Sequence, residues 1–237
     1  MARLPVLMYH NVSPNDNESV ELTISKRKFE EQLQYLAEKN YTTIFASELI
    51  NSNEIPDKSV VLTFDDVTEN QLFHALPLLK KYKCKATFFI PFAYIGKTDT
   101  WNDGSEKIMT IEQLQSLDTE VVELGHHSFL HRKYASLTAE EIQDDFDQSF
   151  EIIRQNNLTV VPALAYPYGN FPKKGVQNEV FFDLLKKNGI QLAFRIGNRT
   201  NKLPLKDKYK VKRIDVKGQD SLLTFKWKLR IGKLRLF

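Results

Sequence analysis

The segment SVVLTFDD, residues 59–66, joins a short run of apolar and β-branched residues directly to two adjacent aspartates. A bounded apolar run of this length is typical of a strand that is buried on both faces. Six other segments have the same character: residues 5–9, 86–90, 120–124, 159–165, 191–196 and 210–216. Strands of this kind occur in parallel sheets that helices cover on both faces, so we expect an α/β fold.

Helical patterns lie between these strands. Residues 26–39 and 70–82 carry apolar side chains three or four positions apart, which is the spacing of an amphipathic helix. Thr110 and Thr138 are each followed three residues later by Gln or Glu, a spacing that predicts the start of a helix. A full eight-stranded barrel usually takes about 250 residues. Seven strands in this chain therefore fit a slightly short or distorted barrel.

Basic residues are in excess at one end of the chain only. Residues 222–237 contain five Lys or Arg and no acid, which leaves 28 basic against 30 acidic residues elsewhere. We therefore divide the chain into a barrel, residues 1–221, and a basic amphipathic tail, residues 222–237, and expect no nucleic-acid partner. The tail fits a strand and a helix equally well. It could lie on an anionic membrane surface or pack on the barrel.

The sequence also bears on the compartment. Cys84 is the only cysteine, which excludes an internal disulfide and fits a reducing environment. The N-terminal residues MARLPVLMYH lack a signal-peptide cleavage site, and no apolar stretch is long enough to cross a bilayer. We expect a cytoplasmic protein, peripheral at the inner membrane face if the tail binds lipid. Export is the alternative if a leader has been removed.

Two clusters at strand ends could form a metal site. Asp65 and Asp66 follow a buried strand, and adjacent carboxylates there are costly unless a cation meets them. His127 and His131 are four residues apart, so a helical turn would bring both rings to one ion, while His126 would lie behind them. Two imidazoles and one carboxylate leave positions open for water and substrate, as catalytic sites do. This ligand set suits Zn²⁺ and does not exclude iron, cobalt or nickel.

The motifs TFDD (residues 63–66), HSFLH (127–131) and YPYG (166–169) resemble, in order and spacing, the first three motifs of the polysaccharide deacetylases. This is the NodB-homology group, or carbohydrate esterase family 4. The resemblance extends from about residue 4 to about residue 216 and implies a distorted (β/α)7 barrel. It also implies that Asp65 is the general base, that Asp66, His127 and His131 bind the metal, and that the Tyr168 backbone N–H contacts the oxyanion.

Two departures from the family pattern point to particular replacements. Ala165 stands where the family has the arginine that orients the base, and Arg213 is our candidate to replace it. No histidine follows His131, although the family's last motif supplies one. The opening LPVLMYHNV resembles the poly-N-acetylglucosamine deacetylase branch, whose barrel is circularly permuted so that this strand comes first. On that basis His10 is the general acid.

The expected activity is removal of N-acetyl groups from an amino sugar, in a polysaccharide or a lipid-linked saccharide. Trp101, in the long polar stretch 94–109, is the candidate for contact with the sugar, together with Pro167 and Tyr168. The alternatives are a deformylase, an acetyl-ester hydrolase, or a catalytically silent carbohydrate-binding homologue. The polymer and the oligomeric state are left open.

Overall fold

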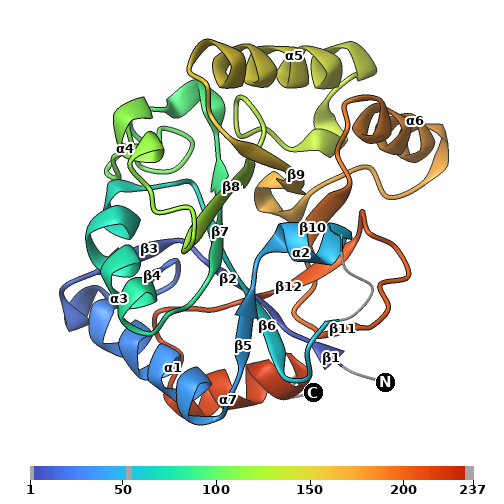
Figure 1. The fold of residues 1–237 in the computed structure, drawn as a ribbon. Coiled ribbons are helices and arrows are strands. Elements are labelled where there is room, and N and C mark those ends of the chain that lie inside the picture. Colours follow the sequence, from blue (N-terminus) through green and yellow to red (C-terminus); the bar gives the residue numbers. More distant parts are fainter. Residues whose placement is uncertain (1–2, 52–54, 233–237) are drawn as a thin grey trace.

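The segment that ends in the two aspartates forms β6 (Ser59–Asp65), and all seven of its residues are buried. The computed structural model describes residues 3–51 and 55–232. In this part of the chain seven parallel strands close into a barrel (Figure 1). The ring runs from β6 through β7 (Ala86–Ile90), β8 (Val122–His126), β9 (Val160–Ala165), β10 (Leu192–Ile196), β12 (Val211–Asp215) and β2 (Val6–Tyr9) back to β6. The predicted fold class is confirmed, and each predicted strand is present within two residues of its expected ends.

Five short strands were not predicted from the sequence: β5 (Thr42–Ile44) joins the barrel sheet, and the other four form two small sheets of their own. β5 pairs with the first half of β6, and three residues are too few to show a periodic pattern. β1 (Arg3–Leu4) is antiparallel to β11 (Asn201–Lys202), and β3 (Asn11–Ser13) is parallel to β4 (Thr23–Ser25).

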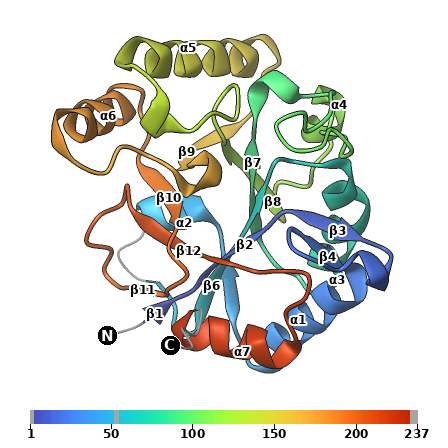
Figure 2. The same cartoon turned by 180° about the vertical axis from the view of Figure 1, so that it is seen from behind.

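Helices surround the barrel, as Figures 1 and 2 show from its two sides. Thr110 and Thr138 form the predicted capping boxes. The predicted helix at 70–82 has a wide π turn, Gln71–Ala75, before its α-helical part; Pro77 there has no N–H to donate to the preceding turn. The helices are α1 (Lys26–Glu38), α2 (Ala46–Asn51), α3 (Leu76–Lys81), α4 (Ile111–Gln115), α5 (Ala139–Gln155), α6 (Gly175–Lys187) and α7 (Leu222–Ile231). Single 3₁₀ turns span Asp16–Glu18, Phe92–Tyr94, Tyr134–Ser136 and Pro167–Gly169.

The alternation of side chains along β6 decides which residues reach the inside of the barrel. Leu62 and Phe64 face outward into the core beneath the helices, where the Phe64 ring stacks on Tyr9 with centroids 5.1 Å apart. Val61 belongs instead to a separate core inside the barrel. Because successive side chains alternate, Asp65 faces the same way as Val61, at the carboxyl end of the strand. The fold thus places a carboxylate inside the barrel at the end where such barrels carry their active sites.

The last described element is a helix that packs on the barrel. Phe225 and Leu229 of α7 are buried in the main core, and the Phe225 ring meets Tyr35 of α1 edge to face at 6.3 Å. Residues 222–231 are therefore helical, which decides between the two patterns that the sequence left open. Residues 233–237 lie outside the described part, and the division of the chain at residue 221 stays a prediction. Within the described residues, no helix has the length and apolar character needed to span a membrane.

Candidate metal centre

Asp66 leaves the end of β6 through a strained turn. Asp66 and Val67 have φ angles of 76° and 45°, and a positive φ is rare for a β-branched residue such as Val67. The Asp66 N–H still donates to the Phe89 carbonyl at 3.0 Å, so the strand pairing reaches the turn before the chain bends. Asp65 therefore points into the barrel, while the carboxylate of Asp66 is carried toward the histidines. Strain of this kind persists where the surrounding structure fixes it, and it is concentrated at functional sites.

The two histidines converge through an irregular turn and not through a helix. Ser128 and His131 have φ angles of 65° and 52°, which turn the chain after β8. The side chain of Asp145 on α5 accepts the backbone N–H groups of Phe129 and Leu130 at 2.9 and 3.4 Å. It also accepts the Tyr134 hydroxyl at 3.0 Å. The convergence is as predicted, but a buried carboxylate from a neighbouring helix takes the place of helical hydrogen bonds.

Asp66, His127 and His131 present three ligand atoms to one point. The His127 and His131 Nε2 atoms are 3.2 Å apart, and they lie 3.5 and 3.4 Å from Asp66 Oδ1. Ligands about 2.1 Å from a tetrahedral ion are separated by roughly 3.4 Å from one another, so these spacings fit one bound ion. The His127 Nδ1–H donates to the Ala165 carbonyl at 2.8 Å, which leaves the Nε2 lone pair facing the ion position. Asp66 Oδ1 is buried and has no hydrogen-bond partner among the described residues. This is expected of an oxygen whose partner is a metal ion.

The electrostatics of the three groups also favour a cation. Burial, with the charges of Asp65 and Asp99, raises the pKa of Asp66 well above its usual value. Burial lowers the pKa of His127 to about 4, so its imidazole is neutral near pH 7. A neutral imidazole is the form that binds a metal, and a cation beside Asp66 would offset the repulsion from the other carboxylates.

Arg213 crosses from β12 to hold Asp65. Its Nη1 and Nη2 donate to the two carboxylate oxygens of Asp65 at 2.5 and 2.7 Å, and both side chains are almost completely buried. Although burial raises the pKa of Asp65, the charge of Arg213 and its hydrogen bonds outweigh that effect and hold the pKa well below its usual value. Asp65 is therefore an ionised carboxylate that does not belong to the ligand triad. Arg213, the predicted replacement for the family's arginine, is thus in position to orient Asp65.

His10 lies on the other side of Asp65. Its Nε2 is 3.8 Å from Asp65 Oδ2, the same distance that separates His127 Nε2 from that oxygen. Burial lowers the pKa of His10, and the charges of Asp65 and Asp215 oppose part of that shift. The side chain of Gln71 donates to the backbone carbonyls of His10 and Asp65 at 2.9 and 2.6 Å, which ties the ends of β2 and β6 together.

Aromatic side chains form one wall of a cavity of about 200 Å³ over these residues. The Trp101 ring stacks on His131, with centroids 4.4 Å apart and planes 27° from parallel, and Tyr168 meets the same imidazole edge-on at 4.9 Å. Tyr168 is half exposed, while Pro167 beside it is buried and is not part of the cavity lining. The lining comprises Met8, His10, Asn11, Leu22, Asp65, Asp66, Thr68, Asp99, Trp101, Asn102, His127, His131, Tyr168, Gly169, Ile196, Arg213 and Asp215.

A glycine sets the position of Tyr168. Gly169 has a φ of 61°, and a Cβ added there would lie 2.7 Å from both the backbone nitrogen and the Cγ1 of Ile196. No other residue fits this turn without displacing the end of β10.

Four residues of the site were missed in the sequence. Gln71 and Asp99 give no signal, because each reaches the site through a turn whose path the sequence does not show. The other two could have been noticed: Asp145 interrupts the apolar face of α5, and Asp215 is two positions from Arg213 at a strand end. Polar residues at buried positions are a signal of function when a partner meets them.

Comparisons with known proteins identify the family of the chain. The model of the polysaccharide deacetylase family matches residues 52–193. The poly-β-1,6-N-acetyl-D-glucosamine N-deacetylase of Staphylococcus epidermidis is 27% identical over 232 residues, covering 88% of this chain and 77% of that protein. YxkH of Bacillus subtilis, provisionally named a polysaccharide deacetylase, is 28% identical over 196 residues, or 81% of this chain. The chain spans 64% of the length of YxkH.

Solved structures show the same fold. The Streptococcus pyogenes deacetylase PplD, in complex with acetate, superposes with a TM-score of 0.75 at 24% identity, covering 97% of this chain and 99% of that one. IcaB from Ammonifex degensii has a TM-score of 0.75 at 24% identity, covering 91% and 92% of the two chains.

Proposed function

The chain belongs to the polysaccharide deacetylase family, and from that premise we propose that it is a metal-dependent hydrolase that removes acetyl groups from the nitrogen of an amino sugar in a saccharide. The observation that carries the proposal is the pairing of two separate groups in one cavity: the ligand triad of Asp66, His127 and His131, and the ionised Asp65 held by Arg213. A binding module would need neither a buried metal triad nor a second carboxylate kept charged beside it. The activity named for the Staphylococcus epidermidis relative supports a poly-N-acetylglucosamine substrate.

Asp66, His127 and His131 would hold the ion. A divalent ion bound there would lower the pKa of water to about 7 and polarise the amide carbonyl. The chemistry of the three ligands suits Zn²⁺, with iron, cobalt or nickel as alternatives.

Asp65 would take the proton of the attacking water. The bidentate bond from Arg213 keeps this carboxylate ionised and fixes its direction, while Oδ2 remains 3.8 Å from both His10 and His127. As the oxygen of water attacks the carbonyl carbon, its proton passes to Asp65, and the Tyr168 backbone N–H would help to bind the oxyanion. General base catalysis of this kind contributes roughly 10²- to 10⁴-fold.

His10 would complete the reaction as the general acid. The breaking C–N bond leaves its electron pair on the sugar nitrogen, which takes a proton from His10. The products are the free amine and acetate. The proton held by Asp65 returns through solvent to His10, which restores the base and the acid. The base and the acid come from neighbouring strands, β6 and β2, so the amide would lie between Asp65 and His10.

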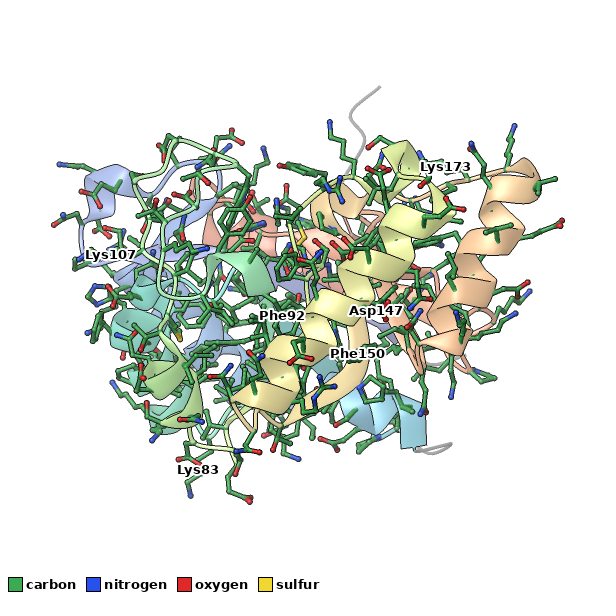
Figure 3. The ribbon with its side chains drawn as sticks, turned by 90° about the horizontal axis from the view of Figure 1, so that it is seen from above. Lys83, Phe92, Lys107, Asp147, Phe150 and Lys173 are labelled. Carbon is green, nitrogen blue, oxygen red and sulfur yellow. The ribbon has the colours of Figure 1, made fainter. Side chains whose placement is uncertain are left out.

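Acetate release from N-acetylated saccharides tests the proposal. The protein is stripped with a chelator, reloaded with Zn²⁺, Fe²⁺, Co²⁺ or Ni²⁺, and assayed on N-acetylglucosamine oligomers with β-1,6 and β-1,4 linkages. Asp65→Asn should abolish turnover while the metal content stays near one ion per chain, whereas His127→Ala should lose both. Asp147→Asn, on the exposed face of α5 (Figure 3), is the matched control.

The products separate the rival activities. Formate in place of acetate would identify a deformylase, and release from O-acetylated but not N-acetylated sugars an ester hydrolase. Oligomer binding without any release would identify a silent binding homologue. Acetate release that survives both chelation and Asp65→Asn would contradict the mechanism itself.

A further inference from the structure

A second cavity, of about 440 Å³, adjoins the catalytic one, and its size is in the range of small-molecule sites. Its walls come from the ends of β10 and β12, the loop before α7, and α7 itself. The lining comprises Asn198, Asp215, Lys217, Gln219, Asp220, Leu223, Thr224, Trp227, Lys228 and Gly232. The proposed mechanism uses none of these residues except Asp215, whose charge acts on His10.

The two cavities share their boundary. Asp215 lines both, and Ile196 lines the catalytic cavity while Asn198, two residues later, lines the second. Leu22 likewise lines the catalytic cavity, and Glu21 beside it bonds to Lys217 of the second. A chain molecule that leaves the catalytic cavity past Asp215 would therefore enter the second one.

The base of the second cavity is held by buried polar bonds. The Lys228 ammonium is 6% exposed, donates to the Asp215 carbonyl at 2.6 Å and pairs with the Asp220 carboxylate. The same Asp220 carboxylate accepts the Lys217 N–H at 2.8 Å. These bonds fix the loop between β12 and α7, so the cavity is formed before any ligand arrives.

One wall is apolar and exposed. Leu223 and Trp227 are one helical turn apart on α7, and they remain 65% and 43% exposed. The opposite face of α7 buries Phe225 and Leu229, so the exposed pair is not needed to attach the helix. An indole ring beside polar groups suits a sugar, because the C–H face of the pyranose can lie on the ring while the hydroxyls bond to the polar wall.

Each of the two lysines that line this cavity in the described part of the chain is paired with a carboxylate. Lys228 pairs with Asp220, Lys217 pairs with Glu21, and the Lys226 ammonium is turned away, 4.8 Å from the centroid of the Tyr35 ring. A surface that binds anionic lipid needs unpaired basic residues around its apolar side chains. Paired charges around a concave wall favour a neutral ligand over a membrane.

We propose that this cavity is a subsite for a further sugar residue of the same saccharide chain, one or more units away from the amino sugar in the catalytic cavity. The proposal rests on the proposed function for the identity of that chain. Trp227 is its stacking wall, Leu223 extends the apolar face, and Asp215 separates the two sites. The enzyme would then prefer oligomers long enough to fill both cavities.

Chain-length dependence tests the subsite. We would measure kcat/KM of the zinc-loaded protein for N-acetylglucosamine oligomers from the dimer to the hexamer, and hexamer affinity by calorimetry on the Asp65→Asn protein. The ratio of kcat/KM for hexamer to dimer should fall roughly threefold to tenfold in Trp227→Ala, the loss expected for one aromatic contact. Calorimetry should show the same loss of hexamer affinity in the double variant. Phe73→Ala removes an aromatic ring that is 55% exposed and lines neither cavity, and it should leave both values unchanged.

Each other outcome is decisive. An unchanged hexamer-to-dimer ratio in Trp227→Ala would overturn the subsite, whether or not the overall rate falls. Loss of binding to phosphatidylglycerol vesicles in Trp227→Ala, with oligomer affinity unchanged, would assign the surface to a membrane. If no oligomer is deacetylated but hexamer binding still depends on Trp227, the subsite stands and the proposed activity fails.

Discussion

Replacing Arg213 by methionine should change both the stability of the barrel and the pH at which the enzyme works. Arg213 and Asp65 have side chains only 1% and 3% exposed, and two hydrogen bonds of 2.5 and 2.7 Å join them. Methionine fills similar space but leaves Asp65 buried without its counterion. Removing one partner of such a pair typically costs about 3 to 5 kcal/mol. We expect a loss of this size at neutral pH in denaturant titrations.

The direction of the pH effect follows from the pKa of Asp65. In the native protein this pKa lies below the value of about 3.9 that an unfolded aspartate has, so Asp65 stabilises the fold above pH 4 and loses that contribution as the pH falls. Without Arg213, burial is the largest influence and moves the pKa above 3.9. The destabilisation should therefore be largest at neutral pH and shrink as acid protonates Asp65.

Activity should report the same shift. A base must be ionised, so the acid limb of kcat/KM should move to higher pH in Arg213→Met. Arg213→Lys keeps the charge but cannot bond both oxygens of Asp65. Its acid limb should therefore lie between those of Arg213→Met and the wild type. Lys212→Met removes a cation from the next position of β12, whose side chain faces the other way, and should shift neither property. An acid limb that stays in place in Arg213→Met would refute the role given to the pair.

Three further predictions concern the surroundings of the site. Asp145→Ala leaves two N–H groups of the histidine turn without their acceptor, so zinc affinity should fall about 10- to 100-fold in a chelator competition, with Asp147→Ala as control; equal affinities in the two variants would contradict this. Burial lowers the pKa of His126 to about 4, so between pH 6.5 and 4 only the unfolded state binds a proton there, and the metal-free protein loses stability. In His126→Phe this loss of unfolding free energy should be smaller by up to roughly 3 kcal/mol. Denaturant titrations in which both proteins lose the same stability over this pH range would speak against it. Trp101→Ala should raise KM about tenfold with little loss of bound metal, since its ring walls the cavity without being a ligand; an unchanged KM would show that the ring does not touch the sugar.

The strands and most helices could be predicted because their signals are local. Each barrel strand is a bounded apolar run, and the capping boxes at Thr110 and Thr138 bring the helix start and its hydrogen-bond partner into four residues. The three-residue strand β5 had no such signal, because its position depends on pairing with β6. The strand or helix character of residues 222–231 was equally open, since packing of Phe225 and Leu229 on the barrel decides it.

The candidate metal ligands could be predicted for a similar reason, and the residues that support them could not. Asp66, His127 and His131 are unusual residues at strand ends, so their chemistry shows in the sequence. The residues that hold them come from elsewhere in the chain: Asp145 from a helix and Gln71 from a π turn. Arg213 was proposed only because the family resemblance left a place to fill. The structure shows what spacing cannot: β12 and β6 lie on either side of β2, so the side chains of Arg213 and Asp65 meet inside the barrel.

Asp65 and Asp66 show how the fold gives opposite properties to neighbours of the same type. Both are buried carboxylates at the end of one strand, yet the pKa of Asp65 lies below its usual value and that of Asp66 well above it. Arg213 accounts for the low pKa of Asp65. Burial, with the charges of Asp65 and Asp99, raises the pKa of Asp66, and its Oδ1 has no hydrogen-bond partner among the described residues. The strained turn at Asp66 and Val67 separates the two side chains, because an undistorted strand would send Asp66 outward into the apolar core. The backbone strain therefore separates a carboxylate that is ionised at rest, as the proposed base must be, from a neighbour that a cation would neutralise.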